Sequence, residues 1–182
     1  LVSKFISKFV DLSAFGKNLI EGILKIAIFI GYTALTALTK DIRRTYEYHG
    51  AEHKTIACYE HEEELTVENV KKYTRFHPRC GTSFIFLVLF ISIFVNTIFR
   101  VSWASILLRV VIKIALLPIV TGIAYELIRL AGRYDNIFTK IISAPGLWIQ
   151  RITTSEPDES QIECAIAALK ACIPENKEDD KW

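Results

Sequence analysis

Three apolar segments constrain what this 182-residue chain can fold into. The first is Leu19–Thr39, and the second is Thr82–Phe99, which has eighteen residues and no charge. The third is interrupted at its beginning by Arg109 and Lys113 and is then apolar over Ile114–Tyr125. Roughly 20 apolar residues suffice for a helix to cross the hydrocarbon core of a bilayer. In a bilayer, a helix satisfies all the backbone hydrogen bonds of a spanning segment within that segment. The sequence therefore predicts an all-α membrane protein with about three transmembrane helices.

The spans divide the chain into six predicted segments. In order, these are an amphipathic interfacial helix (1–18), the first transmembrane helix (19–39), a polar cytoplasmic loop with His and Cys motifs (40–81), a transmembrane hairpin of the second and third helices (82–131), an interfacial segment (132–154), and a soluble C-terminal helix and tail (155–182). The helix over 1–18 could equally pack on other spans. Within the loop, Thr66 is the predicted N-cap of a short helix that continues to Phe76. Pro78 suits the first position of the second span.

Composition agrees with a membrane location. Hydrophobic residues make up 51% of the chain and the mean hydropathy is +0.29, so a fully soluble fold is not expected. The net charge of +2 gives no reason to expect nucleic-acid binding. No pair among the four cysteines has the C-x-x-C spacing, and we expect free thiols. The chain begins at Leu1 and has no methionine, so we expect residue 1 to lie within a longer protein.

Lysine and arginine are distributed unevenly about the three spans. The loop over 40–81 carries eight, and the chain from Arg129 onward carries seven. The opposite side has three before the first span and two more at Arg100 and Arg109. Cytoplasmic segments carry the excess of basic residues in membrane proteins. The sequence therefore predicts a multi-pass protein of the cell membrane, with the motif loop and the C-terminus in the cytoplasm.

Two short motifs at the ends of the loop contain residues that bind metals. His49, Glu52 and His53 have the order H-x-x-E-H, which also occurs in inverted zinc metallopeptidases. On a helix their spacing places all three on one face. His77 and Cys80 stand just before the second span. Both motifs are expected at one membrane level, which indicates chemistry at the bilayer surface.

Two ligand sets are consistent with these motifs and with Glu126 near the end of the third span. In the first, His49, His53 and Glu126 bind zinc, a water fills the fourth position, and Glu52 is the general base. In the second, four side chains close a structural site: His49, His53, His77 and Cys80. Each residue also has an ordinary interpretation: Glu126 can pair with Arg129 or Arg133, His77 can cap a helix, and Cys80 can simply pack in a core.

The two motifs and three later blocks resemble one protein family. The segments that carry the resemblance are YHGAEHKT, HPRCGTSF, and residues 117–133, 144–154 and 156–163. In these the chain resembles the YqhQ-like family of bacterial membrane proteins, whose function is unknown and whose members are described as predicted metal-dependent enzymes. The resemblance covers most of residues 40–171. It implies a membrane location and a metal-dependent activity, and it names no substrate.

Two functions follow from these observations. The first is a membrane protein with a cytoplasm-facing site for a divalent metal, zinc, that acts as a hydrolase on a membrane peptide or lipid. The alternative is a non-enzymatic scaffold or accessory subunit of a larger membrane complex, such as membrane-protein biogenesis machinery, in which the cluster is structural. Membrane lipid is an expected partner in both cases, and association into a larger complex or a homo-oligomer is a further expectation.

Overall fold

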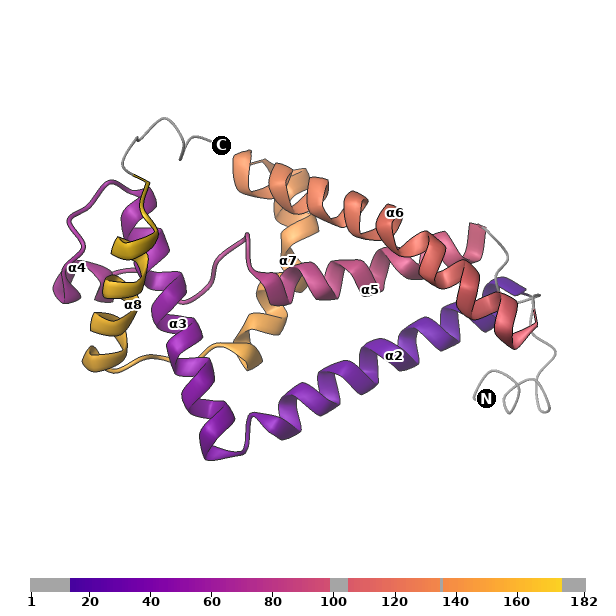
Figure 1. Ribbon diagram of the computed structural model, residues 1–182, viewed down its shortest axis with the longest axis horizontal. Coiled ribbons are helices and arrows are strands. Elements are labelled where there is room, and N and C mark those ends of the chain that lie inside the picture. Colours follow the sequence, from indigo (N-terminus) through magenta and orange to yellow (C-terminus); the bar gives the residue numbers. More distant parts are fainter. Residues whose placement is uncertain (1–13, 99–104, 135, 175–182) are drawn as a thin grey trace.

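The computed structural model describes residues 14–98, 105–134 and 136–174, and these ranges contain helices and no strand. The helices are α2 (Ala14–Thr36), α3 (Lys40–Glu60), α4 (Val67–Lys71), α5 (Gly81–Ile98), α6 (Ile106–Arg133), α7 (Ile137–Thr153) and α8 (Glu159–Cys172). Figure 1 shows two groups of helices, with α2, α5 and α6 in one and α3, α4 and α8 in the other. Helix α7 lies between them. The predicted all-α fold is confirmed, while the helix predicted over 1–18 lies mostly outside the described residues.

Within the described residues, three helices are long and apolar enough to cross a membrane, as the sequence predicts. The candidate spans are Leu19–Thr36, Gly81–Ile98 and Leu107–Arg133. The third is longer than expected, because the helix continues through its two basic residues, Arg109 and Lys113. Lys113 Nζ lies 3.0 Å from Glu21 Oε1, which is also 2.9 Å from Lys25 Nζ. Charged groups in spans usually face the protein interior and pair, and this group links α6 to α2.

Residues 40–81, expected to be a polar loop, are mostly helical. Helix α3 follows α2 after a short turn at 37–39 and carries the H-x-x-E-H motif on its central turns. Thr66 caps α4 as predicted, because its hydroxyl accepts a hydrogen bond from the backbone N–H of Asn69 at 3.3 Å. However, α4 ends at Lys71 instead of Phe76. The chain leaves the helix there and passes back toward α3 and α7.

The second span begins at Gly81, so the prediction that it starts at Pro78 is wrong. Pro78 and Arg79 form a turn, and the Cys80 carbonyl accepts the first helical bond, from Phe84 N at 3.0 Å. The reason is that His77 is held by a side chain of α7. Gln150 Oε1 accepts from His77 N at 2.8 Å, and Gln150 Nε2 donates to His77 O at 2.7 Å.

Helix α8 packs against α3 and α4 within the chain. Ile162 and Ile166, four residues apart on one face of α8, form a core with Ala51, Cys58 and Val70. A capping box starts the helix, because the Asp158 carboxylate accepts from Gln161 N at 2.9 Å and Gln161 Oε1 accepts from Asp158 N at 2.9 Å. These two isoleucines thus hold α8 against α3, the helix that carries the H-x-x-E-H motif.

Helix α7 occupies most of the segment 132–154 and is amphipathic, and the interfacial position of this segment stays a prediction. One face of α7, which includes Gly146, Ile149 and Gln150, is buried against the neighbouring helices. The other face exposes four large apolar side chains: Ile137, Phe138, Ile141 and Trp148. A Cβ atom on Gly146 would lie 2.6 Å from Ser83 Cβ, so only glycine allows this close approach of α7 to α5. An amphipathic helix with an exposed apolar face suits the membrane surface.

A candidate metal centre at the start of the second span

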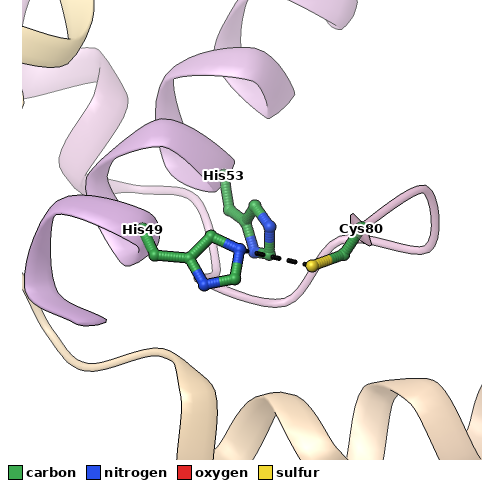
Figure 2. A group of neighbouring side chains, drawn as sticks. All are labelled: His49, His53 and Cys80. Carbon is green, nitrogen blue, oxygen red and sulfur yellow. Dashed lines mark hydrogen bonds between the residues drawn. The ribbon is translucent and has the colours of Figure 1, made fainter. Parts of the chain in front are cut away.

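His49 and His53 project from successive turns of α3 toward the start of α5 (Figure 2). Their ring centroids are 4.3 Å apart, as the i, i+4 spacing predicts. Cys80 is the residue that immediately precedes α5, and its Sγ lies 3.3 Å from His49 Nε2. The three side chains come from two segments that are far apart in sequence, and they meet where α3, α5 and α7 converge.

Each imidazole of the pair is oriented by a backbone carbonyl. His49 Nδ1 lies 2.8 Å from the carbonyl oxygen of Thr153, and His53 Nδ1 lies 2.7 Å from that of Arg75. A carbonyl oxygen only accepts hydrogen bonds, so Nδ1 carries the proton in both rings. In the neutral imidazole this leaves a lone pair on Nε2, the nitrogen nearest Cys80 in His49. Metal-binding histidines show the same arrangement, in which the non-ligating N–H is held by a carbonyl or carboxylate.

Cys80 is buried, with 3% of its surface exposed, and is surrounded by polar groups. Its Sγ is 3.0 Å from the Thr82 hydroxyl in addition to the contact with His49. Burial alone would raise the pKa of the thiol, but hydrogen bonds to the thiolate from Thr82 and from His49 and His53, when these imidazoles are also protonated on Nε2, outweigh it and lower the pKa to about 5. Burial likewise lowers the pKa of His49, yet the Cys80 thiolate and the Thr153 carbonyl raise it overall. The local environment therefore favours the thiolate, which is the form that binds metals.

The three donor atoms lie close enough together to be candidate ligands of one metal ion. One ligand atom each of His49, His53 and Cys80 lies within 4.8 Å of the other two. A tetrahedral zinc with Zn–N and Zn–S bonds of ordinary length holds its nitrogen and sulfur ligands about 3.6 Å apart. The 3.3 Å between His49 Nε2 and Cys80 Sγ is close to this value. The residues therefore fit a zinc ion with three protein ligands.

Gly50 permits the backbone arrangement that orients His49. The chain after α7 crosses α3 at this point, and Ser155 N donates to the carbonyl of Tyr46 at 2.9 Å. A Cβ atom on Gly50 would overlap the Ser155 carbonyl oxygen, which is backbone and cannot rotate away. The crossing brings the Thr153 carbonyl to His49. The glycine inside the H-x-x-E-H motif thus has a structural reason that its sequence position alone does not reveal.

His77 lies beside the cluster, with its ring centroid 5.7 Å from that of His53, but both of its nitrogens have other partners. Nδ1 accepts from Arg79 N at 3.3 Å, and Nε2 lies 3.2 Å from Glu60 Oε2. This is the tautomer opposite to that of His49 and His53. Glu60 also pairs with Arg79. The side-chain contacts of His77, together with the hydrogen bonds of its backbone to Gln150, thus fix the turn that presents Cys80.

The two predicted carboxylates lie outside the group of three donors. Glu52 is exposed and lines a groove between α3 and α8, although its charge contributes to the raised pKa of His49. Glu126 is exposed on α6 and lies 3.4 Å from Arg129 Nη1, the ordinary pairing considered for it. Of the six predicted site residues, the structure brings together His49, His53 and Cys80. The roles of Glu52, His77 and Glu126 in metal binding or catalysis stay predictions.

Several residues that shape the site were not identified from the sequence. Thr153 and Arg75 contribute through their carbonyl oxygens, and a backbone atom leaves no signature in residue type. Thr82 contacts the thiol, and Gln150 holds the turn at His77. Gln150 lies on the buried face of α7 together with small and polar residues such as Gly146 and Thr153, so the sequence pattern did not distinguish it.

Comparison with known proteins shows the family of this chain and leaves its activity open. The model of the family described as a protein of unknown function, DUF1385, matches residues 1–175. The chain belongs to this family. It is also 41% identical over 155 residues to the uncharacterized protein YqhQ of Bacillus subtilis, a match that covers 85% of this chain and 48% of the relative. The chain therefore spans about half the length of the curated relative it matches. No solved structure matches it.

Proposed function

We propose that this membrane protein binds a divalent metal, zinc, through His49, His53 and Cys80, and that the site hydrolyses a membrane lipid or peptide. The observation that carries the proposal is the orientation of the two imidazoles, whose Nδ1 atoms are both held by carbonyl oxygens so that Nε2 is available to a ligand. When bound, zinc polarises a carbonyl or phosphoryl oxygen and lowers the pKa of a water molecule. Catalytic zinc sites have three protein ligands and one open position, and this group has three donors.

Glu52 is the proposed proton acceptor. It lies on α3 between the two histidines, and its side chain is exposed. To reach a water molecule at the cluster, the carboxylate has to change rotamer from the groove beside α8 toward His49. Exposed side chains make such changes rapidly, on a timescale of picoseconds to nanoseconds. A rotamer change of this kind is the step that the proposed role requires.

The alternative is a structural role, in which the cluster acts as a staple: it holds neighbouring segments of the chain together and catalyses no reaction. Three segments meet there, namely α3, the turn at 75–80 and the crossing at 153–155, and all are joined by hydrogen bonds. A metal would strengthen this junction without any reaction. The protein would then be a scaffold or accessory subunit of a larger membrane complex. We also propose that this junction faces the cytoplasm, on the basis of the distribution of lysine and arginine.

Substitution of Glu52 by Gln separates the two functions. If Glu52 is a base, Glu52→Gln retains the metal and the fold, because the amide has the same volume, but it fails to complement a deletion of the protein in cells. If the cluster is a staple, Glu52→Gln complements fully. Glu163→Gln, an exposed position on α8, is the matched control and should complement in both cases. Full complementation by Glu52→Gln would exclude its role as base.

A further inference from the structure

A second feature lies directly beside the cluster: an apolar cavity enclosed by α5, α6 and α7. Its volume is about 450 Å³, within the range of roughly 300–1,000 Å³ that is usual for sites of small ligands. The wall is apolar apart from the hydroxyls of Ser83 and Ser143. The side chains that the argument uses are Ser83, Phe90 and Phe94 from α5, Leu127 and Ala131 from α6, and Ile141 from α7. A site of this kind selects an apolar ligand.

The cavity has the length of one membrane leaflet. It extends along α5 from Ser83, in the first turn, to Phe94. With a rise of 1.5 Å per residue these positions are about 16 Å apart along the helix axis. The hydrocarbon core of a bilayer is about 30 Å thick, so the cavity reaches from the membrane surface to about the bilayer centre. An acyl chain of a lipid in one leaflet covers the same depth.

The cavity also opens sideways to the surroundings of the spans. Phe90 is 47% exposed, Phe94 is 54% exposed and Ile141 is 65% exposed, although all three contribute to its wall. In a membrane these faces contact hydrocarbon, so a lipid chain can enter without passing through water. A helix of a partner protein is about 10 Å across and does not fit a space of this volume that three helices enclose.

Positive charge lies at the surface end of the cavity. Pro78 belongs to the wall, and the side chain of the next residue, Arg79, packs on Gly132, immediately after Ala131 of the wall. Arg133 follows at the end of α6. Guanidinium groups at the headgroup level of a membrane attract phosphate. Arg79 is paired with Glu60, so the charge that is complementary to an anionic lipid headgroup is that of Arg133, whose side chain is exposed.

We propose that this cavity binds one acyl chain of an anionic phospholipid from the surrounding membrane, with its phosphate at the end marked by Arg133. The same end contains Pro78 and Ser83, which flank Cys80 in the sequence. The polar part of the lipid therefore lies next to the candidate metal centre. That the lipid is the substrate of this centre rests on the proposed function, whereas binding of the chain does not.

Photocrosslinking in vesicles tests the proposal. The full chain is reconstituted in phosphatidylcholine with a minor fraction of phosphatidylglycerol that carries a diazirine near the end of one chain, and labelled residues are identified by mass spectrometry. Label should concentrate on the deep part of the wall, at Ile91 and Phe94. Ala131→Phe should remove most of this label, because the phenyl ring occupies space in the cavity that the acyl chain would otherwise fill.

Ala115→Phe is the matched control, since Ala115 is exposed on the same helix and does not line the cavity. It should leave the labelling unchanged, and Leu127→Trp provides a second filled cavity in case Ala131→Phe does not fold. Equal labelling in both filled variants and the control, or label spread evenly over exposed residues such as Ile28 and Ile114, would overturn the proposal. Equal labelling by a phosphatidylcholine probe would overturn its headgroup part. His53→Ala should keep the label, so failure of the metal site is distinguishable from failure of lipid binding.

Discussion

Replacement of Gln150 by Leu should destabilise the protein strongly, because this side chain holds the turn before Cys80. Gln150 is completely buried in α7. Its Oε1 accepts from His77 N at 2.8 Å, and its Nε2 donates to His77 O at 2.7 Å and to Ser83 Oγ at 2.8 Å. Leucine has a similar size and no polar atom, so it fills the space and removes all three hydrogen bonds.

The magnitude follows from the groups that lose their partners. The N–H and C=O of His77 and the hydroxyl of Ser83 are left without Gln150, and each buried polar group without a partner costs about 1–3 kcal/mol. Two changes reduce the total, since leucine adds apolar contacts and a water molecule can enter beside Ser83. We therefore expect the free energy of unfolding to fall by about 3 kcal/mol, near the lower limit for three such groups.

Reversible unfolding of the purified protein in detergent micelles measures this change. Arg151→Leu is the matched control, because Arg151 is the next residue on α7 and its side chain is exposed. The control should remain within about 0.5 kcal/mol of the wild type. Gln150→Leu should also weaken metal binding, since the turn that presents Cys80 is no longer fixed. A stability within about 0.5 kcal/mol of the wild type would refute the argument that Gln150 holds this turn.

Three further predictions concern the crossing, the thiol and the orientation. Gly50→Ala should unfold the junction of α3 with residues 153–155, whereas Gly31→Ala, with open space at its Cβ position, should be neutral in the same unfolding measurement; equal effects would contradict the close approach. In metal-free protein, the absorbance of the Cys80 thiolate should persist as the pH is lowered to about 5. The same absorbance should be missing from Cys80→Ser. Because the pKa is lowered, the stability from ionised Cys80 is present above the ordinary thiol pKa and is lost as the pH falls through about 5, and titration near pH 9 would contradict it. The exposed thiols of Cys164 and Cys172 should resist an impermeant maleimide in intact cells and react after lysis, whereas labelling from outside would reverse the orientation.

The membrane architecture was predictable because it depends on a property that every residue type displays. A run such as Thr82–Phe99 has no stable place in water, and the length of the bilayer fixes how long the helix must be. The stretch over 40–60 was harder, since charged residues such as Arg43 and Glu60 suggested a loop. Its helix is stabilised by packing of Ala51 and Cys58 on α8, a contact distant in sequence.

The pairing of His49 with His53 was predictable from helix geometry, and their approach to Cys80 followed from the expected position of both motifs at one membrane level. The choice among ligand sets could not be made from the sequence. It depends on which nitrogen of each ring has a partner, and for His49 and His53 the partners are backbone carbonyl oxygens. Glu126 was expected at the same membrane level, and in the structure it contacts Arg129, because local pairs on a helix form without any tertiary arrangement.

The most direct test of the account is the metal content and ligand environment of the purified wild-type protein. Elemental analysis after mild purification should find about one zinc per chain, and X-ray absorption at the metal edge should show one sulfur ligand and two imidazoles. Cys80→Ser should lose the sulfur signal and most of the metal. Folded wild-type protein without metal, or metal whose signal is the same in Cys80→Ser, would contradict a metal centre formed by His49, His53 and Cys80.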